Sequence, residues 1–260
     1  MKIPALILLI CVCVTLLTAC GGGSTNQAGS LSGNWQITLQ NTDTGAIKSE
    51  SGFFVQTGNS LSGNILLTGQ TVCSGVGSAQ GQVSGSNVSI SVVHMGETLK
   101  LTGTTADGST TMSGDYSILA SPCGNSQVGT WTAVRVPPMT GSLAATFTSG
   151  QTAGPVVNLT GKINQGVNNG GSTANLTGSM TTSDPSCLSS VTIGGQISGT
   201  AVVLNLLSSE GIALGQYIGT ATPDATTITG TYTLFPQGSA TNGCNDFGTG
   251  TVTVQLGPSS

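Results

Sequence analysis

The chain has 260 residues, of which 5% are charged, and its formal net charge at pH 7 is −4. Ordinary soluble domains carry roughly a quarter charged residues, and five basic residues are too few for a phosphate-binding cluster, which argues against nucleic acid as a partner. Glu, Lys and Arg are nearly missing, which excludes a helix-rich fold. β-Branched residues interrupted by 40 glycines favour short strands and tight turns, so we expect an all-β protein.

The first twenty residues have the composition of an export signal. Met1-Lys2 is basic, residues 3–17 are almost all apolar, and the run ends at Leu17-Thr-Ala-Cys20. These last four residues resemble the lipobox of bacterial lipoproteins, in which a leucine stands three positions before an invariant cysteine. The resemblance implies that residues 1–19 are a cleaved signal peptide and that Cys20 carries diacylglyceryl and an N-linked acyl chain such as palmitate. The alternative is an uncleaved anchor, although the apolar run is near the lower limit for crossing a bilayer.

Residues 20–30 are small and polar, which is typical of a flexible tether. Two or more acyl chains hold a protein stably at a membrane. Gly21 follows the cysteine, whereas by the same resemblance aspartate there goes with retention in the inner membrane. We therefore expect a lipid-anchored outer-membrane protein on the periplasmic or surface face of the cell envelope.

A sequence motif (the shared phrase) spans residues 73–88 and recurs at 187–202. In both places a cysteine stands nine positions before Gln-(Val/Ile)-Ser-Gly. This agreement predicts a tandem duplication with repeats at 31–136 and 139–257. Pro137-Pro138 separates the repeats, because proline donates no hydrogen bond to a sheet.

Each repeat contains about eight runs in which apolar and polar residues alternate with the period of a strand. The fourth run in each repeat is the end of the shared phrase. In chain order, the other runs of the first repeat are 31–39, 52–56, 61–65, 88–92, 99–104, 112–116 and 129–134. Those of the second repeat are 139–147, 156–159, 176–180, 202–206, 215–220, 228–232 and 248–254.

Short turns join these runs, so successive strands should be antiparallel neighbours. Eight such strands remove their exposed edges by closing into an up-and-down barrel, and we predict two tandem barrels. The alternative is a pair of β-sandwiches. Gly33-Asn-Trp35 and the recurring Leu-(Ser/Thr)-Gly and (Ser/Thr)-Gly-x-Tyr runs are similar to strands of the lipocalin and avidin families, although Leu143 replaces Trp35 in the second repeat.

Four cysteines remain after the signal segment and Cys20 are set aside, and four cysteines allow three pairings. Because each repeat owns two of them, the duplication predicts disulfides Cys73–Cys123 and Cys187–Cys244 in the oxidising compartment that export supplies. Each would contribute about 4 kcal/mol in the chain-entropy model. A metal site is the rival interpretation, but one histidine and no Cys-x-x-Cys leave it short of ligands, so we expect no metal and no cofactor.

No nucleophile elbow, dinucleotide fingerprint or phosphate loop is present. His94 is the only histidine and is interpreted as a packing or surface residue. The acids Glu50, Glu97, Asp107 and Asp115 could form a carboxylate pair, but scattered acids are mostly solvated turn residues. We therefore predict no catalytic residues and a protein that is not an enzyme.

Trp35, Phe53 and Trp131 could line a ligand cavity, although core packing is the preferred interpretation of these side chains. The preferred function is a non-enzymatic interaction or structural module of the envelope. The alternative is a lipocalin-like binder of a small apolar ligand. A hydrolase would need two acids facing one cleft, and a single sixteen-stranded pore would need more than 4% aromatic residues.

Overall fold

The computed structural model describes residues 29–68, 74–106, 109–119, 125–151, 156–182, 190–235 and 248–257. These residues form sixteen strands and no helix, arranged as two closed antiparallel barrels of eight strands each. The predicted fold class is therefore confirmed, and the sandwich and single-pore alternatives are wrong. Within the described ranges, no helix has the length and apolar character needed to cross a membrane.

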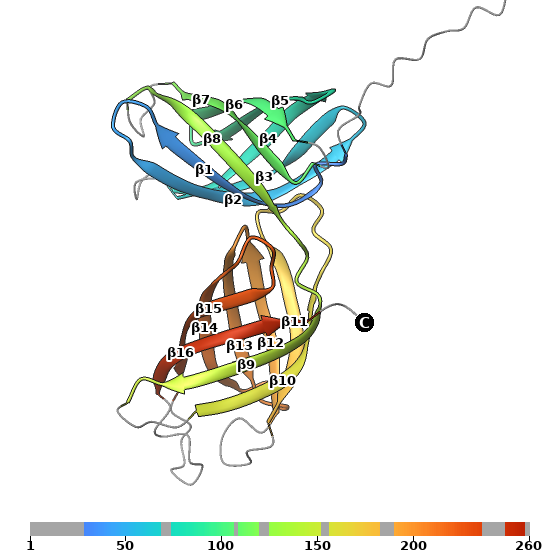
Figure 1. Cartoon of the computed structure of the whole chain (residues 1–260), viewed down its shortest axis with the longest axis vertical. Coiled ribbons are helices and arrows are strands. Elements are labelled where there is room, and N and C mark those ends of the chain that lie inside the picture. Colours follow the sequence, from blue (N-terminus) through green and yellow to red (C-terminus); the bar gives the residue numbers. More distant parts are fainter. Residues whose placement is uncertain are drawn as a thin grey trace, which may run out of the picture.

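Barrel 1 is a meander that closes when β1 pairs with β8 (Figure 1). Its strands are β1 (Gly33–Asn41), β2 (Ile47–Thr57), β3 (Ser60–Leu67), β4 (Gly75–Ser84), β5 (Asn87–His94), β6 (Glu97–Thr105), β7 (Thr111–Ile118) and β8 (Gln127–Val136).

Barrel 2 repeats this plan and closes when β16 pairs with β9. Its strands are β9 (Gly141–Ser149), β10 (Val156–Gln165), β11 (Ala174–Thr181), β12 (Ser190–Ser198), β13 (Ala201–Leu207), β14 (Ala213–Ala221), β15 (Thr227–Leu234) and β16 (Thr249–Leu256).

The residues predicted to be lipidated or disulfide-bonded lie outside the described ranges. The signal peptide, the lipid anchor and both disulfides therefore stay predictions. These residues are Cys20, Cys73, Cys123, Cys187 and Cys244.

Glycines in mid-strand let the barrel walls bend sharply. Gly103 of β6 faces Gly114 of β7, and a Cβ on either would lie 2.0 Å from a backbone oxygen of the neighbouring strand. Gly219 and Gly230 face each other in the same way in barrel 2. Glycine recurs at these positions because adjacent strands approach too closely for a side chain.

Two tryptophans fill the interior of barrel 1. Trp35 and Trp131 are fully buried, and their indole N–H groups donate to the carbonyl oxygens of Leu31 (2.8 Å) and Thr102 (3.1 Å). Leu31 is itself buried at the end of the barrel where the chain enters. Barrel 1 thus has a packed apolar core in which both indole N–H groups are hydrogen-bonded.

Barrel 2 has smaller side chains at the same two places. Strand pairing aligns Trp35 with Leu143, because both lie opposite the β2 or β10 glycine, and it aligns Trp131 with Val252, because both lie opposite the β7 or β15 glycine. The buried aromatic side chains that barrel 2 itself supplies are instead Phe147, Tyr217 and Tyr232. The two barrels therefore share one strand arrangement but fill their interiors with different aromatic side chains at different positions.

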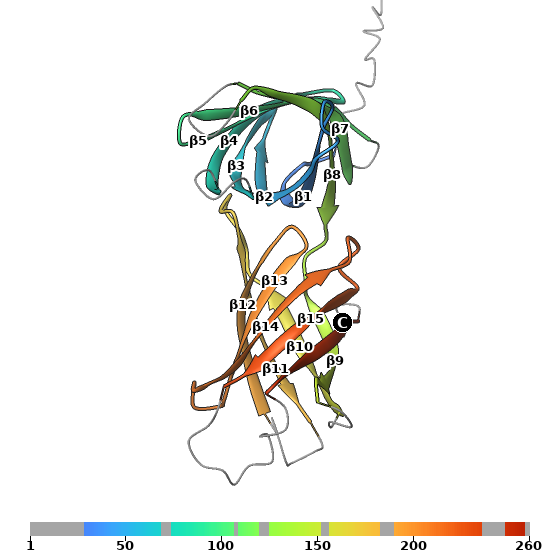
Figure 2. The same cartoon turned by 90° about the vertical axis from the view of Figure 1, so that its left-hand side faces the viewer.

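The side of barrel 1 lies across one end of barrel 2 (Figures 1 and 2). Asn34 of β1 exchanges two hydrogen bonds with Gly199 in the β12–β13 turn: its Nδ2 donates to the Gly199 oxygen (2.8 Å), and its Oδ1 accepts from the Gly199 N–H (2.7 Å). The Oε1 of Gln36 accepts from both the N–H and the hydroxyl of Thr200, each at 3.0 Å. These contacts are all hydrogen bonds, which are directional, so this part of the interface sets the orientation of barrel 1 relative to barrel 2.

Two further pairs extend the polar contact to the neighbouring strands of barrel 1. The hydroxyls of Ser51 and Ser198 are 2.8 Å apart, and Asn64 Nδ2 donates to the Gly170 oxygen at 2.6 Å. The β1–β3 wall is thus fixed to two different connections of barrel 2, which restrains rotation between the barrels.

Phe53, together with Val136 at the end of β8, supplies apolar contacts of the interface. Its neighbour Phe54 points into barrel 1, so Phe53 points outward, yet it is only 3% exposed because it packs into the core cluster of barrel 2. Barrel 1 therefore contributes a side chain to the core of the other repeat.

Alanine at Gly199 is expected to loosen the two barrels. Gly199 has φ 55°, and a Cβ there would lie 2.3 Å from Gln36 Oε1 and 2.6 Å from Ser51 Cβ. Gly85 is a matched control, since it occupies the same turn of barrel 1 with φ 59° and has nothing within 4 Å of an added Cβ. Gly85→Ala should cost about 1 kcal/mol for its left-handed backbone, whereas Gly199→Ala should cost more and also enlarge the molecule in X-ray scattering. Equal losses with unchanged scattering would contradict the interface described here.

Candidate functional site

The three aromatic residues that the sequence suggested as ligand contacts do not share one cavity. Trp35 and Trp131 lie in the core of barrel 1, and Phe53 lies between the barrels. The contribution of these side chains to ligand binding stays a prediction that no contact here supports.

Charged side chains gather instead at one end of barrel 1, which we name the polar mouth. It is the end where β1, β3, β5 and β7 finish and where β2, β4, β6 and β8 begin. Lys48 and Glu50 lie on the lumen side of β2, as Phe54 does, and His94 and Glu97 lie on the lumen sides of β5 and β6 by the same alternation.

Glu50 is the most buried charged residue of the polar mouth. It is 2% exposed, and its Oε2 accepts a hydrogen bond from the Thr68 N–H. Burial raises the pKa of the Glu50 carboxyl, while the Thr68 hydrogen bond and the Lys48 charge act to lower that pKa and the Glu97 charge to raise it. The carboxyl of Glu50 therefore holds a proton to a higher pH than an exposed glutamate does. The charges of Lys48 and Glu97 both act on this carboxyl.

His94 lies at the same mouth, at the end of β5. Its Nδ1 is 3.0 Å from the carbonyl oxygen of Val76, and its ring lies against Gly75, where a Cβ would be 2.8 Å away. Its Nε2 is buried and has no hydrogen-bond partner. A buried ring nitrogen without a partner is costly in water-excluded surroundings, so His94 is a polar group that the packing of barrel 1 leaves unsatisfied.

The neutral polar side chains of Gln127, Asn41 and Tyr116 complete the mouth. Gln127 accepts a hydrogen bond through its Oε1 from Lys48 Nζ at 3.4 Å. Burial raises the pKa of Tyr116, and a hydrogen bond from Asn41 acts against that rise. The mouth thus combines donors, acceptors and ionisable groups from six strands.

Exposed apolar side chains flank these polar groups, and we call them the apolar rim. Six large apolar side chains at this end, each within one residue of a strand end, are exposed. They are Ile47, Val76, Val93, Met95, Leu119 and Val128. Strand alternation points those of β2, β4, β5 and β8 away from the lumen.

Among the residues that the structure describes, barrel 2 has no buried charged side chains at the positions of Lys48 and Glu50. The strand registers align Lys48 with Val157 and Glu50 with Leu159. Duplication alone would give two equivalent mouths, so the charged residues mark barrel 1 as the specialised copy.

Glu50 is expected to make the chain less stable as pH rises. Its ordinary pKa of about 4.3 applies to the unfolded chain, and burial raises the pKa in the folded chain. Between these two values the folded chain holds a proton that the unfolded chain has released, so the free energy of unfolding falls with increasing pH. Urea unfolding between pH 4 and pH 8 should show this fall in the wild type and a smaller one in Glu50→Gln. Parallel pH profiles would contradict the burial of an ionisable carboxyl.

Sequence inspection named Glu50, Glu97 and His94 but interpreted them as solvated or packing residues. Within the described part of the chain, no three His, Cys, Asp or Glu side chains are grouped so as to hold a metal ion. Asp115 lies elsewhere, on the outer wall of barrel 1, and Asp107 is outside the described ranges.

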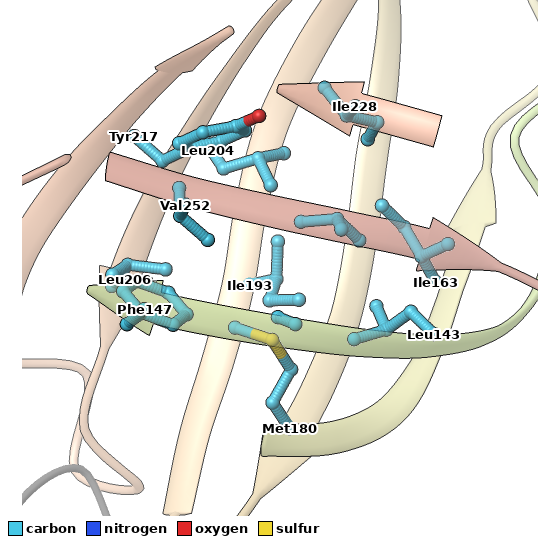
Figure 3. A pocket seen from close by; sticks show the side chains of 12 residues that line it. Leu143, Phe147, Ile163, Met180, Ile193, Leu204, Leu206, Tyr217, Ile228 and Val252 are labelled. Carbon is cyan, nitrogen blue, oxygen red and sulfur yellow. The ribbon is translucent and has the colours of Figure 1, made fainter. Parts of the chain in front are cut away.

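Barrel 2 encloses a small apolar cavity (Figure 3). The space open to the centre of a water-sized sphere is about 10 Å³, which is room for about one water molecule. Its lining includes Leu143 and Val252, the two residues that replace the tryptophans of barrel 1.

In class, the molecule is a tandem of two closed eight-stranded antiparallel barrels. No protein-family model matches the chain, and no curated protein matches it. Among solved structures, it is similar to a crystal structure of kievitone hydratase from Nectria haematococca, with 10% sequence identity and a TM-score of 0.25, over 90% of this chain and 92% of the hydratase chain.

This match corrects one expectation. The absence of local catalytic motifs led us to predict that the chain is not an enzyme, and the structure it matches is an enzyme, so that exclusion is wrong. The physical reason is that acids, bases and histidines from distant strands can meet at one barrel end, as they do in the polar mouth, without forming any local motif. At this TM-score the similarity carries no reaction, substrate or catalytic residue to the present chain.

Proposed function

We propose that the protein is a lipid-anchored binding module of the cell envelope and that the polar mouth of barrel 1 binds a small amphipathic molecule. The lipobox resemblance at Leu17–Cys20 supports the anchor and the envelope location. The apolar rim would contact the body of the ligand, and the charged floor would contact its polar group.

One observation carries the binding site: buried ionisable groups, among them Glu50 and His94 with its unpaired Nε2, lie at a barrel end that is flanked by exposed apolar side chains. Burying a carboxyl costs stability, and barrel 2 shows that apolar residues serve the fold at the same position. The polar residues are therefore better explained by recognition than by stability.

The interior of neither barrel offers a ready cavity for a purely apolar ligand. Barrel 1 is filled by its tryptophans, and the cavity of barrel 2 has room for about one water molecule. Binding at a barrel end is the form of ligand binding that the packing favours.

The proposal is tested with N-phenyl-1-naphthylamine, a fluorescent apolar probe that carries one N–H group. The wild type should bind it saturably, and the double variant Lys48→Val/Glu50→Leu, which copies barrel 2, should bind at least tenfold more weakly. Lys100→Val, on the outer wall of β6, is the control and should bind as the wild type does. Equal binding by all three chains, or no binding by any, would rule out the polar mouth as the site.

The anchor is tested separately by metabolic labelling with an alkyne-bearing palmitate. The wild type should carry the label and sediment with membranes, and Cys20→Ser should do neither. Membrane association of Cys20→Ser would contradict lipid attachment at this residue.

A further inference from the structure

The apolar rim of barrel 1 is larger than a ligand at the polar mouth can cover. Its side chains lie at the ends of β2, β4, β5, β7 and β8, and strand alternation points four of them away from the lumen. A small molecule held at the mouth lies on the other face of the barrel wall from these four. Barrel 2 packs against the side of barrel 1 and leaves this end uncovered (Figure 1).

Met95 occupies a turn position that disfavours its side chain. The β5–β6 hairpin turns through Met95 and Gly96, and both residues have positive φ, 47° and 81°. Asn or Gly is the usual first residue of such a turn, because most side chains are strained in the left-handed region. Met95 is also 65% exposed. The fold gains nothing from an exposed methionine here, which favours a contact outside the chain as its reason.

Barrel 2 shows that polar residues serve the fold at two of the rim positions. Strand pairing aligns Val76 with Ser190 and Val128 with Thr249. Both valines are about half exposed, so they add little to the core of barrel 1. They are therefore better explained by what lies outside the barrel than by its stability.

A membrane lies within reach of the rim when Cys20 is lipidated as proposed. The chain enters barrel 1 at the end opposite the mouth, and the 9 residues of β1 run from there to the mouth over about 30 Å. The chain from Cys20 to Leu31 extends to at most about 36 Å. An anchor at Cys20 thus allows the mouth end to meet the surface of the bilayer.

The charges of this end indicate which lipid surface fits it. Asp43 in the β1–β2 turn is exposed, Glu97 is half-buried, and the chain as a whole has a net charge of −4. Lys48 offsets one of the negative charges at this end. An anionic lipid surface would repel the chain, so a zwitterionic surface is the better match.

We propose that the apolar rim docks barrel 1 on a zwitterionic bilayer surface, with the polar mouth facing the lipid. The rim side chains enter the interfacial layer, and the acyl chains on Cys20 keep the protein at the membrane. The rim orients an anchored protein and is too small to hold an unanchored one. This inference rests on the proposed lipid anchor and does not depend on ligand binding by the mouth.

The test uses the full lipidated protein in nanodiscs of phosphatidylcholine that contain a lipid with a nitroxide on its acyl chain. The methyl signals of ¹³C-labelled methionine are the readout, since a nearby nitroxide broadens them. The Met95 signal should broaden, and those of Met112 and Met180, in the two cores, should stay sharp. Ile218→Met adds a methionine on the exposed outer wall of barrel 2, and its signal should stay sharp as well.

Two double variants test the apolar contact. Ile47→Ser/Leu119→Ser removes two exposed rim side chains and should reduce the broadening of the Met95 signal about tenfold, because less apolar surface is buried in the lipid. Val203→Ser/Ile218→Ser is the matched control. It removes two exposed neighbours on the outer wall of barrel 2 and should leave the Met95 broadening unchanged.

Palmitate labelling of the same sample separates failure of the anchor from failure of the docking. A chain without the label would contradict the anchor and, with it, the docking. A labelled chain whose Met95 signal stays sharp, or broadens equally in both double variants, would overturn the docking alone. A sharp Met95 signal together with a dimer that Ile47→Ser/Leu119→Ser abolishes in sedimentation would assign the rim to a second copy of the chain.

Discussion

Replacing Phe53 by alanine should lower the free energy of unfolding by about 3 kcal/mol, although Phe53 lies on the outside of its own barrel. Its side chain is 3% exposed because it packs into the core of barrel 2. Alanine would leave a cavity between the barrels and expose apolar surface of the second core. Substitutions on the outer wall of a barrel otherwise cost little, so a large loss at this position is diagnostic.

Lys162→Ala is the matched control for Phe53→Ala. Lys162 occupies the position of Phe53 in barrel 2, as the strand register shows, and it is exposed. Urea unfolding should show a loss below about 0.5 kcal/mol for Lys162→Ala. Both tryptophans lie in barrel 1, so their fluorescence reports that barrel, while far-ultraviolet circular dichroism reports both. Transitions unchanged by Phe53→Ala in both probes would show that the barrels are stable independently of this contact.

Replacing Trp35 by alanine should cost about 3–5 kcal/mol, the largest effect expected for a single side chain of barrel 1. The indole is fully buried and its N–H donates to the Leu31 carbonyl oxygen, so alanine would leave both a cavity and an unpaired carbonyl group. Trp35→Leu, which copies Leu143 of barrel 2, should cost less because it keeps part of the volume.

The two tryptophan variants are compared by urea unfolding, with Trp131 fluorescence as the probe that survives. A loss below about 1 kcal/mol for Trp35→Ala would mean that Trp35 packs loosely. That result would favour the hypothesis that Trp35 lines a ligand cavity. It would also weaken the contrast between a filled barrel 1 and a barrel 2 that keeps a cavity.

The strands and their number were predictable because their signals are local. Alternation of apolar and polar residues depends on positions two apart, and the repeated phrase with Gly85 and Gly199 marks equivalent hairpins in both copies. Closure into barrels was predictable because an open sheet of eight strands in each repeat would leave two exposed edge strands, and closure pairs those two edges with each other.

The polar mouth as a cluster was not predictable from the sequence, because its members are distant along the chain. Lys48 and Glu50 occupy positions of β2 that the alternation assigns to the lumen, and this local signal could have marked them as buried. Their proximity to His94 and Glu97 depends on the closure of the sheet, which brings strand ends together at one rim.

The interface between the barrels also depended on tertiary structure. Consecutive phenylalanines at positions 53 and 54 break the alternation, so one of them had to point outward, but the sequence does not name what covers it. The same turn appears at Gly85 and Gly199, yet only Gly199 contacts the other barrel.

The sequence by itself determined an all-β chain, its duplication and the number of strands in each copy, because these follow from short-range periodicity. Only the tertiary structure decided that barrel 1 gathers ionisable groups at one end, that barrel 2 keeps a small apolar cavity, and that Phe53 joins the two cores. These features depend on which side chains meet across a closed sheet and across the two barrels, and such contacts leave no fixed spacing along the chain.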